Sequence, residues 1–252
     1  MPPTPPPRPP TPPPEWPYPK LNLRIEDLAH PGAALFLDNV NPLAALRAAV
    51  LASFEWLYAK PELAPTNVQS ILLVLRPMDG VAYTFGSHTE KEIHFSLDHI
   101  VNSTSRARDE ILGVLVHEVV HCYQHNARGT APGGLIEGIA DFVRLHAKLG
   151  PPHWSRTPSP TDKWDAGYQT TAFFLAWIDA RPHTKPGTVR ALNAAMSDAE
   201  WEDALFVKLA GKPVKELWKE YKRELGVEDE EESKDKEDEG FTLVRSYNPV
   251  YI

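Results

Sequence analysis

The sequence predicts an α+β fold, in which an N-terminal mixed sheet is followed by a mainly helical half. Three observations support this class. Short segments with strand-like alternation or β-branched residues come first, and segments with helical periodicity follow from residue 106 onward. Strands grouped before helices favour α+β over a wound α/β fold. The composition, 42% hydrophobic and 24% charged, is that of an ordinary globular protein.

The elements follow in order. Residues 21–25 alternate like a first strand, and residues 42–59 predict a helix with Asn41 as its cap and Pro42 at its first position. Residues 68–75 and 92–97 predict two further strands. Six helices are then expected, at 106–126, 134–149, 165–180, 188–196, 199–210 and 213–225. One domain is therefore predicted over residues 21–226.

Residues 1–20 form a proline-rich arm that contains twelve of the 26 prolines. Such a segment favours polyproline II structure and cannot build a core. Pro3, Pro6 and Arg8 fit a ligand pattern for SH3- or WW-type domains, but a plain disordered arm explains the composition as well.

Residues 227–240 are predicted to be an acidic linker. Nine acidic residues and two lysines give positions 228–239 a net charge of −7, out of −8 for the chain. The apolar tail 241–252 is expected either to dock on the domain as an added strand or to occupy the cleft of its own or a neighbouring molecule.

Several classes of function are disfavoured. No basic stretch interleaved with aromatic residues suggests nucleic-acid binding, and no apolar run has the length of a membrane helix. The N-terminus has no apolar secretory segment, and the single cysteine, Cys122, excludes an intrachain disulfide. We therefore expect a cytoplasmic or nuclear protein. Cys122 is expected to be a core residue rather than a redox switch.

The motif His117-Glu118-Val119-Val120-His121 lies within an apolar run that predicts a buried helix. Residues four apart share a helix face, so both imidazoles can reach one zinc ion while Glu118 acts as general base on a water molecule. The alternative is a helix with two hydrogen-bonded core histidines.

A third ligand is needed. Gln124 and Ala127 stand where a metzincin has Gly and His, which excludes that class. His125 would lie about 12 Å from His117 along a straight helix, so it is expected at the helix end or along the cleft. Glu137 is the better candidate, and Asp141, four residues later, can accept the N–H of a ligating histidine. A solvated Glu/Asp pair is the alternative.

H-E-x-x-H followed by E-x-x-x-D resembles the gluzincin arrangement, which implies His117, His121 and Glu137 as zinc ligands with Asp141 behind His117. Residues 113–145 resemble the plant basic secretory protein family, a peptidase family of plants and bacteria. Segments 80–84 and 164–175 resemble it more loosely, and the resemblance spans roughly residues 21–225. The acidic charge and the lack of a secretory segment depart from that family.

The resemblance implies a zincin-like domain whose sheet presents an edge strand to the substrate. Our candidates for it are Ile93, His94, Phe95 and Ser96. Tyr168 is expected to stabilise the oxyanion, with His153 as second choice. His94 and His99 are otherwise expected to be ordinary surface residues.

These predictions together indicate a zinc metallopeptidase acting on peptides or proteins. A catalytically silent, zinc-stabilised scaffold that binds partners through the proline-rich arm is the competing class, and hydrolysis of a non-peptide amide stays open. Glu118 favours the enzyme, because a scaffold needs metal ligands but no base.

Overall fold

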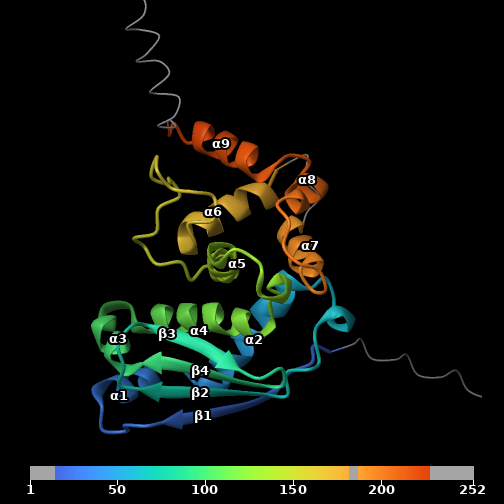
Figure 1. The fold of residues 1–252 in the computed structure, drawn as a ribbon. Coiled ribbons are helices and arrows are strands. Elements are labelled where there is room, and N and C mark those ends of the chain that lie inside the picture. The colour runs from blue at the N-terminus through green and yellow to red at the C-terminus, as the bar shows by residue number, and fades with distance from the viewer. Residues whose placement is uncertain (1–14, 182–186, 228–252) are drawn as a thin grey trace, which may run out of the picture.

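The computed structural model describes residues 15–181 and 187–227 and confirms the α+β class (Figure 1). The elements are β1 (Lys20–Ile25), α1 (Pro31–Asn39), α2 (Pro42–Leu57), β2 (Ser70–Arg76), β3 (Ala82–Gly86), β4 (Glu90–Ser96), α3 (Leu97–Asn102), α4 (Ala107–Tyr123), α5 (Gly133–His146), α6 (Tyr168–Asp179), α7 (Thr188–Ala195), α8 (Ala204–Ala210) and α9 (Val214–Glu224). The SH3-type motif in the proline-rich arm, the acidic linker and the apolar tail lie outside the described residues.

The sheet is mixed, with strand order β1-β2-β4-β3. Strands β1, β2 and β4 run parallel, and β3 runs antiparallel to β4. Strand β4 is therefore an interior strand and β3 forms an edge. Our placement of Ile93, His94, Phe95 and Ser96 at the substrate-facing edge is wrong, because β3 covers the outer side of β4.

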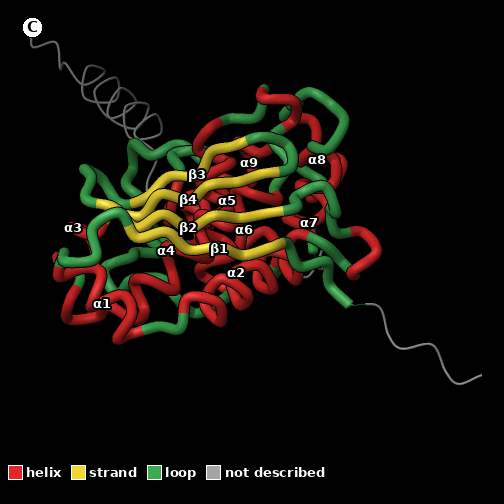
Figure 2. Tube along the Cα trace, turned by 90° about the horizontal axis from the view of Figure 1, so that it is seen from below, coloured by secondary structure: helices red, strands yellow, loops and turns green. Residues whose placement is uncertain are grey.

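Helices α2 and α4 cover the same face of the sheet. Figure 2 looks onto the opposite face, so the strands lie in front of these helices. Ile93 and Phe95 point into the core, whereas His94 lies on the opposite face. His94 is only 6% exposed, because the Tyr83 ring stacks on it at 4.9 Å. It is therefore not the surface residue that we expected.

Helix α4 is the central helix of the domain. It packs against α2 on one side and α5 on the other, and Ile111, Leu115 and Val119 are fully buried. Such all-round burial is what the apolar run predicted. Among the described residues, no single helix is long and apolar enough to span a membrane; α1 and α2 meet those criteria only as a pair bent by 68°.

Helices α5 and α6 pack directly against each other, and Gly138 permits the approach. A Cβ atom at this position would lie 2.3 Å from Cγ2 of Thr171 on α6. Thr171 is fully buried, and its hydroxyl donates to the Trp164 carbonyl and accepts from the Gly167 amide, both at 2.9 Å. The glycine thus fixes the spacing between α5 and the start of α6.

Gly138→Ala should lower the free energy of unfolding by at least about 1–3 kcal/mol, the usual cost of overpacking. Gly133→Ala is the matched control in the same helix, because a Cβ there meets nothing within 4 Å. Urea denaturation of both variants tests this expectation. Equal unfolding midpoints for the two would contradict it.

Candidate metal centre

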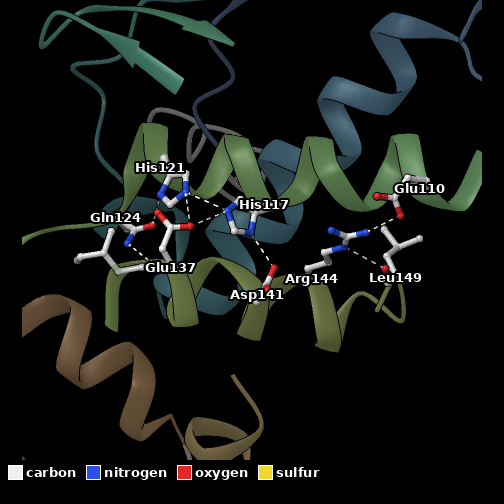
Figure 3. A network of polar contacts seen from close by, with 9 residues as sticks. Glu110, His117, His121, Gln124, Glu137, Asp141, Arg144 and Leu149 are labelled. Carbon is white, nitrogen blue, oxygen red and sulfur yellow. Dashed lines mark hydrogen bonds and ion pairs between the residues drawn. The ribbon is translucent and has the colours of Figure 1, made fainter. Parts of the chain in front are cut away.

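Helices α4 and α5 face each other and bring their polar side chains into one row (Figure 3). Each of His117, His121 and Glu137 offers a ligand atom, and these atoms lie within 4.8 Å of one another. The two Nε2 atoms are 3.2 Å apart, and Glu137 Oε2 lies 3.1 Å from that of His117 and 3.7 Å from that of His121. The cluster could therefore hold a metal ion.

The outer nitrogen of each imidazole is already engaged. His117 Nδ1 lies 2.7 Å from Asp141 Oδ1, and His121 Nδ1 lies 3.0 Å from Gln124 Oε1. Both oxygens accept, so each Nδ1 is the donor. In the neutral imidazoles each Nε2 then has the lone pair that a metal ion needs, whereas in the metal-free cluster a proton on Nε2 can be donated to Glu137. This arrangement of tautomers suits a metal ion, since outer hydrogen bonds of this kind orient ligating histidines.

Gln124 has a role that the sequence did not reveal. It follows the last turn of α4, and its Nε2 donates to the Ile136 carbonyl on α5 at 2.9 Å. Its amide therefore orients His121 and joins the two helices. The spacing of Gln124, three residues after His121, could have indicated this contact, because residues three apart share a helix face.

The residues of the cluster shift one another's pKa values. Burial alone would lower the pKa of His117, but the bonds to Asp141 and Glu137 outweigh it and raise the pKa to about 9. Burial opposes ionisation of Glu137, but its bonds to His117 and His121 hold its pKa well below the usual range. The cluster thus attracts positive charge, which a proton or a metal ion can supply.

Glu118 lines the same cleft as the three ligands and is held by the sheet. Its carboxylate accepts a hydrogen bond of 2.6 Å from the Thr84 hydroxyl on β3, and the residue is 6% exposed. Thr84 Oγ1 also lies 3.0 Å from the Glu118 carbonyl. No local sequence pattern indicates this contact, because 34 residues separate its partners.

The outer edge of β3 carries free backbone groups. Ser96 N donates to Val81 O, and Ser87 N donates to Glu90 O, which fixes the alternation of the β3–β4 ladder. In such a ladder every second residue turns both backbone groups away from its partner. Ala82 and Thr84 are two such residues, and neither has another backbone partner among the described residues.

A cleft of about 910 Å³ joins these features, with β3 on one side and α4 and α5 on the other. Tyr168 and His153 both line it. Tyr168 opens α6 with a left-handed φ of 44°, is 58% exposed, and stacks on His117 with ring centroids 6.1 Å apart. The Glu137 carboxylate, followed by partial burial, raises the pKa of Tyr168, so the phenol stays a donor.

Two other predicted residues lie apart from the cluster. His125 follows the end of α4 and meets the Tyr58 ring edge-on at 6.3 Å, and it does not line the cleft. Cys122 is buried, and burial raises its thiol pKa to about 12. Such a thiol is poorly reactive, in keeping with a core residue.

The polar row continues beyond the metal cluster (Figure 3). Glu110 accepts from Arg144 Nη2 at 2.9 Å, from His99 Nε2 at 2.9 Å and from Arg106. Burial opposes ionisation of Glu110, but the His99 bond and both arginines outweigh it and lower its pKa to about 2. His99, which we expected on the surface, is therefore part of the cleft wall.

Glu110→Gln should destabilise the metal-free protein at pH 7 by about 3 kcal/mol, since it leaves the buried Arg144 and the partly buried Arg106 with one partner fewer. The folded-state pKa of Glu110 is depressed. Its contribution to the free energy of unfolding is therefore present above about pH 4.5 and is lost as the pH falls towards about 2. The difference between variant and wild type should therefore shrink over that range in urea denaturation.

Glu220→Gln is the control, because Glu220 also lies between two cations but its partner Lys212 is 45% exposed. This change should cost less than about 1 kcal/mol. A constant gap between Glu110→Gln and wild type from pH 7 to pH 3 would contradict the assignment.

Comparison with known proteins bears on the family of the chain. No curated protein sequence matches the chain significantly. A family model described as "Peptidase of plants and bacteria" matches residues 18–221, which include β3, the facing helices α4 and α5, and Tyr168. This match confirms the resemblance seen in the sequence, and the chain belongs to this peptidase family.

Proposed function

We propose that this protein is a zinc-dependent peptidase in which Glu118 is the general base. The single observation that carries the proposal is the position of Glu118, which is buried beside a three-ligand cluster and fixed by Thr84. A metal site with a purely structural role needs no such carboxylate.

Zinc fits the donor set. Two imidazole nitrogens and one carboxylate oxygen are the protein ligands typical of a catalytic zinc site, which leaves a further position open. When bound by His117, His121 and Glu137, zinc would supply Lewis acidity, polarising a carbonyl and lowering the pKa of water.

The chain's own groups supply the rest of the chemistry. The Glu118 carboxylate accepts a proton from the attacking water and returns it to the leaving amine. The Tyr168 phenol, at the opposite wall of the cleft, donates to the oxygen that gains charge in the transition state. Asp141 and Gln124 keep the two imidazoles in their orientation.

Strand β3 is suited to bind an extended peptide. The free backbone groups of Ala82 and Thr84 face outward at the edge, so a substrate can add as an antiparallel strand. Thr84 then binds substrate with its backbone and holds Glu118 with its side chain. The scaffold alternative leaves this double use of Thr84 without a purpose.

Glu118→Gln should abolish cleavage of a casein or peptide-mixture substrate while zinc content stays at the wild-type level. The amide keeps the shape of the side chain but cannot take the proton. Glu216→Gln, an exposed position on α9, is the matched control and should retain full activity. Zinc content by atomic absorption and peptide release are measured together. Undiminished cleavage by Glu118→Gln would rule out this mechanism.

Thr84→Val should lower kcat by about 10- to 100-fold, the range expected when a hydrogen bond to a charged group is lost. Zinc affinity should stay unchanged, because Thr84 touches no metal ligand. Thr84→Ser keeps the hydroxyl and should recover most of the rate. Steady-state kinetics and a zinc titration provide the comparison, and equal rates for the Val and Ser variants would show that the bond is dispensable.

A further inference from the structure

The cleft extends beyond the metal cluster to a second polar group, which the proposed mechanism does not use. We call Arg106, Glu110, Arg144 and His99 the Arg144 cluster. Arg144, Glu110 and His99 line the same cleft as His117 and Glu137. Figure 3 shows Arg144 and Glu110 in line with the metal cluster, between α4 and α5.

The Arg144 side chain is buried in a space left by a glycine of α4. The side chain is only 8% exposed, and a Cβ at Gly113 would lie 2.6 Å from its Nε. The missing side chain lets the guanidinium lie directly against α4, although glycine inside a helix costs about 1 kcal/mol relative to alanine. The Trp154 ring lies 5.3 Å from Arg144 Cζ and adds a cation–π contact.

The guanidinium retains an unused donor group. Its Nε donates to the Leu149 carbonyl at 3.1 Å and its Nη2 donates to Glu110 at 2.9 Å. Its Nη1 has no hydrogen-bond partner among the described residues. Nη1 is not among the buried side-chain atoms that lack a partner, so it is open to the cleft and can donate to an acceptor that binds there.

The charges favour an anionic acceptor. Glu110 is shared by Arg106 and Arg144, so these three groups carry a net charge of +1. Asp141, one turn before Arg144, is bonded to His117. Burial lowers the pKa of Arg144, and Arg106 adds to this effect, whereas Glu110 and Asp141 oppose it.

The strand direction of β3 determines which end of a bound peptide points towards the Arg144 cluster. Strand β4 ends at Ser96, which caps α3, and His99 of α3 bonds Glu110 near the start of α4. Ala82 lies opposite Phe95, so the beginning of β3 is at this end of the cleft (Figure 1). A peptide antiparallel to β3 therefore points its C-terminal side towards Arg144.

We propose that the Arg144 cluster is a subsite for a substrate carboxylate on the C-terminal side of the scissile bond. This inference rests on the proposed peptidase function. Glu110 and His117 are seven residues apart on α4, or about 10 Å. An extended peptide advances about 3.3 Å per residue, so the carboxylate belongs to one of the first two or three residues after the scissile bond. It is either an acidic side chain or the C-terminal carboxylate of a short peptide.

The test uses the zinc-loaded full chain and dipeptides that carry an N-terminal metal-binding hydroxamate. The hydroxamate fixes the register, so both residues lie on the C-terminal side. Compounds with Glu, Gln or Leu at the first residue and Ala at the second, each as free acid and as amide, are compared by calorimetry. Arg144→Met is the variant. Arg181→Met is the control, because Arg181 also pairs with a carboxylate and a tryptophan ring but lies outside the cleft.

We expect the preferred carboxylate form to bind about tenfold or more tightly than its amide, as for charge-assisted hydrogen bonds. A Glu-over-Gln preference identifies a side chain, and an acid-over-amide preference identifies the terminus. Arg144→Met should remove the preference and Arg181→Met should retain it. Equal binding of acids and amides by the wild-type protein would overturn the subsite, and this comparison does not depend on the folding of any variant.

The outcome also separates the subsite from the peptidase proposal. Carboxylate preference without cleavage of any peptide would reject the peptidase and leave the Arg144 cluster as a carboxylate-binding site only. Cleavage without carboxylate preference would reject the subsite alone. Failure of every hydroxamate to bind would reject both.

Discussion

The structure depends on one constraint: polar and charged side chains on a buried helix must each find a hydrogen-bond partner. Helix α4 is covered by α2, by the sheet and by α5, yet it carries His117, Glu118 and His121 in its C-terminal half. Polar groups in such a place must each find a partner, because an unpaired buried group costs several times what a typical hydrogen bond contributes. Those partners come from α5, from β3 and from the residue that ends α4, and together they define the site.

The elements that pack against α4 contribute different side chains to the site. Helix α5 provides Glu137 for the metal cluster and Asp141 for the orientation of His117, while β3 provides Thr84 for Glu118. The same helix pair then holds the Arg144 cluster. The proposed metal ligands and the Arg144 cluster are thus positions along one helix–helix contact, while the proposed base, Glu118, is held by β3.

Local signals in the sequence predicted much of this. Asn41 does cap α2, where its side chain accepts from Ala44 N at 3.0 Å, and the predicted helix at 42–59 is observed over Pro42–Leu57. The faces of α4 and α5 followed from residues four apart, which is a local property of a helix. Strand β3 was missed because its five residues lie half-exposed at an edge and show no buried stripe. Without β3, the edge strand was misplaced and the role of Thr84 stayed hidden, since both depend on long-range pairing.

The start of α6 has a consequence for how the cleft receives a substrate. Thr171 secures Gly167 through a buried hydrogen bond, and Gly134 approaches Asp165 so closely that a Cβ would lie 1.8 Å from its carbonyl oxygen. The backbone before Tyr168 is therefore clamped against α5, while the Tyr168 ring itself is 58% exposed. A ring on a fixed backbone adjusts by rotation about its side-chain bonds, on the timescale of rotamer exchange. This wall of the cleft is thus preorganised, and substrate entry requires little ordering of the chain around it.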